Sequence, residues 1–268
     1  MFPSRANRIR RAYSLIELVV VLTILASLAG LTVSIVGWLK QSADKGTAAH
    51  TMGSLLSNIE LYHVSTGAYP NQFDSLLDGT GNLYAGNGTT DFGLHTELRD
   101  ATQGKITSTS LDANMLKALS NAGILAVMDH LPLTGTETIP GNTGSIFRAL
   151  AAGGKVATIN SSSADGQAII DAVYPPQNGG VSGSGLPANI RLLVFGFGPR
   201  CTSVGKTIVA PPSYSGVGDV STIYNRFLCV FAVPTDGSET PAQLKTVIDS
   251  KGDFLNQELA EFYRTKPQ

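Results

Sequence analysis

One apolar segment near the start of the chain constrains the fold more than any other feature. Residues 13–39 are almost continuously apolar, and no charged residue occurs from Leu18 to Leu39. At about 1.5 Å per residue, a helix of that length covers the ~30 Å hydrocarbon core of a bilayer. The sequence therefore predicts a transmembrane helix, with the rest of the chain forming a separate head.

Charges around this segment predict its orientation and mark one residue as functional. Four arginines and no acidic residue precede it: Arg5, Arg8, Arg10 and Arg11. By the positive-inside rule, the N-terminus lies in the cytoplasm and everything after Lys40 is exported. Glu17 lies near the start of the apolar run. A carboxylate at that depth costs on the order of 3 kcal/mol, so we expect Glu17 to be functional and to pair with a cation.

The residues from Arg10 to Leu18 read Arg-Arg-Ala-Tyr-Ser-Leu-Ile-Glu-Leu and resemble the processing site of type IV pilins and type II secretion pseudopilins. In that family a basic leader ends in a small residue, followed by an aromatic residue, Thr or Ser, two aliphatic residues and Glu. The resemblance implies that a prepilin peptidase cuts after Ala12 and methylates the new amine of Tyr13. Ala12 stands where Gly is usual, and Tyr13 where Phe is usual. In the family the matching Glu, here Glu17, pairs with the N-terminal amine of a neighbouring subunit.

The resemblance also implies a function and partners. It predicts a structural subunit of a type IV pilus-like or type II secretion pseudopilus filament, and not an enzyme. The implied partners are further copies of the chain, related pilin-like subunits, a prepilin peptidase and an inner-membrane assembly platform. The implied location is the bacterial inner membrane, crossed once, with the filament in the periplasm or on the cell surface. The alternative is a membrane-anchored exported enzyme or binding module that does not polymerise.

Three other interpretations of the N-terminus stay open. An ordinary signal anchor would use the same apolar helix without assembly. A cleaved secretory signal would use the small residues of Ser27-Leu28-Ala29 before Gly30, although Glu17 interrupts its apolar region and the apolar run continues beyond the cut. Arg10-Arg11 is also compatible with a twin-arginine signal.

The helix is expected to continue past the apolar segment and to pack against the head. No proline occurs between Leu39 and Thr66, and apolar residues recur there at three- and four-residue spacing, which is typical of an amphipathic helix. These residues are Ala49, Met52, Leu55, Leu56, Ile59 and Tyr62 or His63. Gly67 and Pro70 then end the helix, in a Gly-x-Tyr-Pro motif that is similar to one in pseudopilins. The predicted divisions are a cleaved leader over 1–12, a transmembrane half over 13–39, an amphipathic half over 40–66 and an exported head over 67–268.

The predicted fold class is α+β, with the long N-terminal helix packed against an antiparallel β-sheet head that carries additional short helices. The β-rich runs 190–198 and 226–233 predict two adjacent antiparallel strands. Further predictions are a turn or short helix at 73–77, a loop over 79–110, and helices over 111–130, 145–152, 240–248 and 253–264.

The two cysteines, Cys201 and Cys229, both fall in the part predicted to be exported. An oxidising compartment permits a disulfide between them, and we predict this bridge. The alternative is two free thiols, with Cys229 acting as a small apolar residue within a strand.

Composition and motifs exclude several other functions. A net charge of −1 and only 15% charged residues argue against nucleic-acid binding, which needs clustered Lys and Arg. The four histidines lack metal-ligand spacing, and Gly205-Lys206-Thr207 lacks the first glycine of a phosphate-binding loop because Arg200 takes its place. We therefore predict no catalytic residues, no cofactor and no metal.

Overall fold

The computed structural model describes most of the chain and divides it into two compact units, Met1–Ala43 and Asp44–Gln268. The described residues are 15–86, 93–100, 102–130, 145–176, 185–214, 216, 223–257 and 259, without the side chains of residues 31–42, 130, 145 and 146.

Helix α1, Leu15–Thr66, runs through both units. No helix in the described part of the chain offers an apolar stretch of membrane-spanning length. The transmembrane half predicted over residues 13–39 and the predicted inner-membrane location are therefore wrong.

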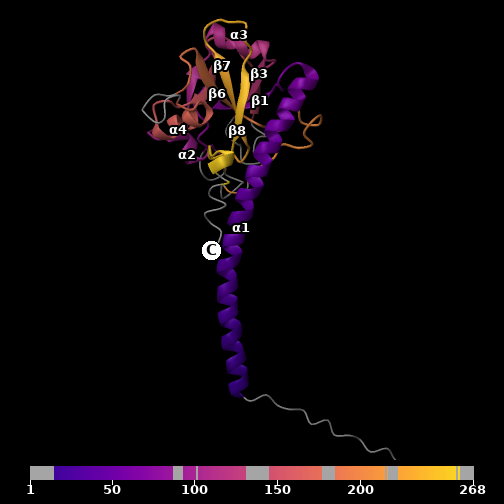
Figure 1. The fold of residues 1–268 in the computed structure, drawn as a ribbon, viewed down its shortest axis with the longest axis vertical. Coiled ribbons are helices and arrows are strands. Elements are labelled where there is room, and N and C mark those ends of the chain that lie inside the picture. The colour runs from indigo at the N-terminus through magenta and orange to yellow at the C-terminus, as the bar shows by residue number, and fades with distance from the viewer. Residues whose placement is uncertain are drawn as a thin grey trace, which may run out of the picture. The chain divides into compact units, whose positions relative to one another are not determined.

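The second unit is an α+β domain built on an eight-stranded mixed sheet (Figure 1). Its strands are β1 Phe73–Asp78, β2 Ile106–Ser110, β3 Ala126–His130, β4 Ser145–Ala149, β5 Lys155–Ile159, β6 Ile190–Gly196, β7 Leu228–Pro234 and β8 Gln243–Ile248. Its helices, besides the second part of α1, are α2 Thr96–Arg99, α3 Ala113–Asn121 and α4 Ala164–Val173.

The prediction of a wholly antiparallel sheet is wrong, because the sheet is mixed. Along one path the strands follow the order β2-β5-β6-β1-β3-β4, and β7 pairs with both β6 and β8. Strands β1 and β3 are parallel, with Phe73 opposite Val127. The predicted antiparallel pair is confirmed, since β6 and β7 pair over their full lengths from Ile190 opposite Pro234 to Gly196 opposite Leu228. The sheet is mixed because β1 leads into β3 through a crossover that contains α3.

Alternating side chains of the central strands fill two cores, one on each face of the sheet. Leu193 and Phe195 of β6 belong to one core, and Leu192 and Val194 belong to the other. This alternation follows from the two-residue period of a strand. The first core includes residues of α1 and α3, and the second includes residues of α2 and α4. The second unit therefore has three layers, with helices on both faces of the sheet.

The amphipathic half of α1 supplies the predicted stripe to the first core. Met52, Leu55 and Ile59 are almost completely buried, and Leu56 packs against them while only partly buried. The helix ends as predicted, because Gly67 has a φ of 76° and its amide donates to the His63 carbonyl at 2.8 Å. The helical residues from Asp44 onward thus belong to the same compact unit as the sheet.

Several predicted elements are wrong. Residues 73–78 form β1 rather than a turn or helix, and residues 145–149 form β4. The predicted helix over 111–130 is α3 followed by β3, because Gly123 adopts a φ of 89° between them. Residues 243–248 form β8 in place of a helix, and the predicted loop over 79–110 contains α2 and β2. Of the helix predicted over 253–264, residues 255–257 are helical and much of the remainder lies outside the described residues.

Candidate functional site

The first unit carries an apolar helical surface that stays exposed among the residues that the structure describes. Ten large apolar side chains between residues 15 and 28 are exposed, from 47% for Val19 to 82% for Leu15. They are Leu15, Ile16, Leu18, Val19, Val20, Val21, Leu22, Ile24, Leu25 and Leu28. Exposed apolar surface is unfavourable in water, so a continuous surface of this kind marks an interaction site.

This surface surrounds the helix and is not restricted to one face. Every residue from Leu18 to Leu22 is apolar and exposed. Successive residues of an α-helix are roughly 100° apart, so these five positions cover more than a full turn. The nearby hydroxyls do not interrupt the surface, because Thr23 donates to the Val20 carbonyl and Ser27 donates to the Thr23 carbonyl, both at 2.8 Å. One partner on one side cannot cover such a helix.

The residues predicted for processing and assembly fall in or next to this surface. Ala12 and Tyr13 lie outside the described residues. Glu17 is exposed in the first turn of α1, and it is the single charged residue between Leu15 and Gly30. An acid in the first turn is favoured by the helix dipole, which places partial positive charge there. Whether a peptidase cuts after Ala12 stays a prediction.

Both cysteines are buried thiols in the structure. Cys201 and Cys229 lie in the first core, and the Cys201 sulfur is 3.4 Å from the Ser203 hydroxyl. Burial raises the pKa of Cys201 to about 12 and that of Cys229 well above its ordinary value. Both groups are therefore protonated at neutral pH and poorly nucleophilic. The disulfide stays a prediction.

A carboxyl group is buried in the centre of the sheet. Asp74 of β1 is 1% exposed, and its Oδ2 accepts a hydrogen bond from the Tyr224 hydroxyl at 2.7 Å. Burial raises the pKa of Asp74 to about 7, although Arg226 acts in the opposite direction. Gly198 leaves room for this carboxyl, because a Cβ there would lie 2.1 Å from Asp74 Oδ1. Because protein encloses the Asp74 carboxyl, its protonation affects the free energy of unfolding of the second unit.

Lys105, the residue immediately before β2, is also buried, and its ammonium group is fully engaged. Lys105 Nζ donates to Asp253 Oδ1 at 2.8 Å and to the Lys251 carbonyl at 2.9 Å. Burial lowers the pKa of Lys105, but the Asp253 carboxylate more than offsets this and the pKa is raised overall. Asp249 is buried next to these residues, and burial raises its pKa to about 6. The contacts of Lys105 therefore link the start of β2 to the residues that follow β8.

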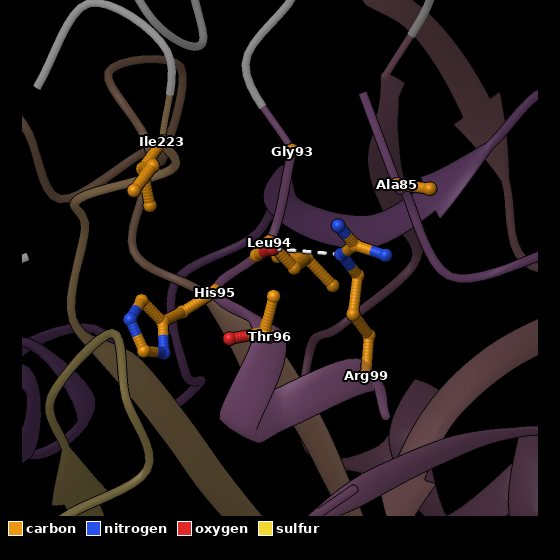
Figure 2. A pocket seen from close by; sticks show the side chains of 7 residues that line it. All are labelled: Ala85, Gly93, Leu94, His95, Thr96, Arg99 and Ile223. Carbon is orange, nitrogen blue, oxygen red and sulfur yellow. Dashed lines mark hydrogen bonds between the residues drawn. The ribbon is translucent and has the colours of Figure 1, made fainter. Parts of the chain in front are cut away.

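The second unit also contains a pocket of about 220 Å³ next to α2 (Figure 2). Its lining comes from the segment before α2, from α2 itself and from the segment before β7. The lining residues are Ala85, Gly93, Leu94, His95, Thr96, Arg99 and Ile223. Figure 2 shows the Arg99 guanidinium between Ala85 and Leu94. His95 and Ile223 lie beyond Leu94 in this view. The site was not predicted from the sequence, because no local pattern brings Ile223 to residues 85–99.

No group of three or more potential metal ligands occurs within the residues that the structure describes. Comparison of the chain with protein-family models, curated proteins and solved structures found no match. The resemblance to pilins therefore depends on residues 10–18 and on the character of α1.

Proposed function

We propose that this chain is a structural subunit of a pilus-like filament and that it assembles through the N-terminal half of α1. In this proposal a prepilin peptidase removes residues 1–12, and the mature chain begins at Tyr13. Further copies, and related pilin-like subunits, then pack their helices around residues 15–30. The head, which is held to α1 by the first core, is displayed by the assembled helices.

The observation that carries the proposal is the exposed apolar surface around α1. Fully burying one such side chain contributes roughly 1.5–3 kcal/mol, so ten of them provide a large driving force for association. A two-fold dimer covers one side of each helix, whereas a helical assembly places neighbours on every side. A surface that is apolar all round therefore favours an open, repeating assembly over a dimer.

The sequence of the segment supports the same function. The apolar surface begins three residues after the predicted cleavage site, and Glu17 stands at the position of the pairing acid in the pilin-like motif. The resemblance implies a charge match between Glu17 and the Tyr13 amine of another subunit. Such a pair in a low-dielectric helix bundle is weakly screened and fixes the register between neighbours.

The test is the mature N-terminus together with the assembly of a Glu17→Ala variant. Mass spectrometry of the native protein is expected to find a chain that starts at Tyr13, with a methyl group on its amine. Electron microscopy is expected to find filaments of the unaltered chain and few or none of Glu17→Ala, because that variant loses the charge match. Circular dichroism checks that its head remains folded.

Glu239→Ala is the matched control, because Glu239 is an acid on the surface of the second unit with 80% of its side chain exposed. This variant is expected to form filaments in normal yield. A native chain that retains Arg10 and Arg11, or a normal filament yield from Glu17→Ala, would contradict the proposal.

A further inference from the structure

The pocket beside α2 contains a guanidinium group whose hydrogen-bonding capacity the described residues leave largely unused. Arg99 is half-buried, and its Nε donates to the Leu94 carbonyl at 2.9 Å. Within the described residues, that is the single hydrogen bond of its side chain, and no carboxylate lies at ion-pair distance from it. A guanidinium has five N–H donors, so four remain on Nη1 and Nη2. These nitrogens line the pocket (Figure 2).

The backbone around Arg99 is held in place before any ligand arrives. The Leu94 amide donates to the Tyr84 carbonyl at 2.8 Å, and the Tyr224 amide donates to the Gly93 carbonyl at 2.8 Å. Gly93 permits a close approach of two segments, because a Cβ there would lie 2.0 Å from the Ala85 oxygen. Since Leu94 also fixes the Arg99 Nε, binding requires little reorganisation of the charged group.

The rest of the pocket combines apolar walls with neutral polar groups. Ala85, Leu94 and Ile223 supply the apolar part. The Glu97 amide donates to His95 Nδ1 at 3.3 Å, so in the neutral ring the proton is on Nε2. Burial lowers the pKa of His95, which keeps the ring neutral at pH 7. Arg99 is thus the one cationic side chain among the lining residues.

We propose that this pocket binds a small carboxylate with a short aliphatic body. The planar Nη1 and Nη2 edge of Arg99 matches the two oxygens of a carboxylate, and the aliphatic body contacts Leu94 and Ile223. One cation does not balance a phosphate dianion, and about 220 Å³ is below the ~300 Å³ of drug-sized sites. Both a free carboxylic acid and the terminal carboxylate of a peptide ending in Leu present this chemistry. The inference is independent of filament assembly.

The first experiment compares two ligands on the unaltered full-length chain by ligand-observed NMR. The probes are 4-methylpentanoate and 4-methylpentanamide, which differ in charge but hardly in shape. The acid is expected to bind at least about tenfold more tightly, because the amide loses the charge-assisted pair. Equal affinity, or no binding of either probe at about 10 mM, would overturn the proposal.

The second experiment changes the protein. Arg99→Gln is expected to weaken binding of 4-methylpentanoate by about tenfold or more, while the matched control Arg200→Gln, at an exposed arginine outside the pocket, keeps the original affinity. Thermal unfolding tests whether both variants fold. If Arg99→Gln does not fold, the comparison of 4-methylpentanoate with 4-methylpentanamide on the unaltered chain decides whether the proposal holds. Unchanged affinity in a folded Arg99→Gln variant would refute the assignment.

A third comparison separates the two sources of the carboxylate. Acetyl-Ala-Ala-Leu with a free terminal carboxylate is tested against the same peptide with a terminal amide. Tighter binding of the free peptide than of 4-methylpentanoate identifies a protein or peptide terminus as the ligand. Binding of 4-methylpentanoate without binding of the peptide identifies a free small acid.

Discussion

Asp74 illustrates how a single residue ties the stability of the second unit to pH. Its carboxyl is buried, its pKa is raised to about 7, and the ordinary value for an aspartic acid is about 4. Between those values the folded chain keeps the proton on Asp74 and the unfolded chain releases it. The free energy of unfolding therefore falls as pH rises from about 4 to about 7, by at most about 1.4 kcal/mol per pH unit from this group, and the effect ends above pH 7.

Replacing Asp74 by Asn is expected to remove this contribution. The amide oxygen still accepts the Tyr224 hydroxyl, but the side chain has no proton to release. Urea unfolding followed by circular dichroism at pH 4, 5.5, 7 and 8 measures the slope. Asp74→Asn is expected to show a flatter dependence between pH 4 and 7 than the unaltered chain. Identical slopes for the two proteins would show that Asp74 is ionised throughout this range.

At the same scale, residues in strong local patterns could be predicted from the sequence, whereas residues whose environment depends on distant parts of the chain could not. Glu17 is conspicuous because an acid interrupts an apolar run. Asp74 and Arg99 look like ordinary surface charges in the sequence. Their environments depend on Tyr224 and Ile223, which are more than a hundred positions away and reach them through the fold. Burial of a polar side chain is a tertiary property, so a local pattern does not predict it.

At the scale of elements, α1 has two parts that make opposite use of their apolar residues. From Asp44 onward the helix packs one stripe into the first core, whereas residues 15–28 expose apolar side chains all round. The first arrangement stabilises the second unit, and the second leaves a surface for other chains. A three- to four-residue spacing predicted the stripe correctly, because it is a periodic signal.

A pair of variants in α1 tests the role of the stripe. Ile59→Ala is expected to lower the free energy of unfolding by about 2–5 kcal/mol, because Ile59 is fully buried and its truncation leaves a cavity. The matched control is Leu61→Ala, two residues along, where the residue is 56% exposed, and its effect is expected to stay within about 0.5 kcal/mol. Urea unfolding measures both. Similar effects for the two variants would mean that the stripe does not anchor α1.

The elements that sequence analysis predicted wrongly share a physical cause. Strands β6 and β7 are seven residues long and mostly apolar, with valine and phenylalanine in each, and both were predicted. Strand β1 is short and contains Leu76 at a φ of 63°, which breaks the alternation expected of a strand. Before β8, Thr240-Pro241 resembles the start of a helix, but the next amide, of Ala242, donates to the Ala118 carbonyl of α3. Tertiary pairing overrides local preference in such segments.

At the scale of the whole molecule, the chain combines an apolar helical segment with an independently stabilised head. The head has a core on each face of its sheet, so its folding does not depend on residues 15–30. The proposed assembly through those residues therefore leaves the pocket beside α2 as a separate feature of the head. A chain with these two properties is suited to repeat in a filament while presenting a binding site on each copy.

The most direct test of this account is site-specific photo-crosslinking from Val21, which lies in the middle of the exposed apolar surface of α1. A photoreactive amino acid is placed at position 21 of the full-length chain, and the crosslinked products are identified by mass spectrometry. We predict adducts between copies of the chain, with attachment points concentrated in residues 15–30 of the neighbouring copy and extending into ladders of several subunits. A protein that gives no adduct between copies, under conditions in which the native chain is abundant, would contradict assembly through this helix.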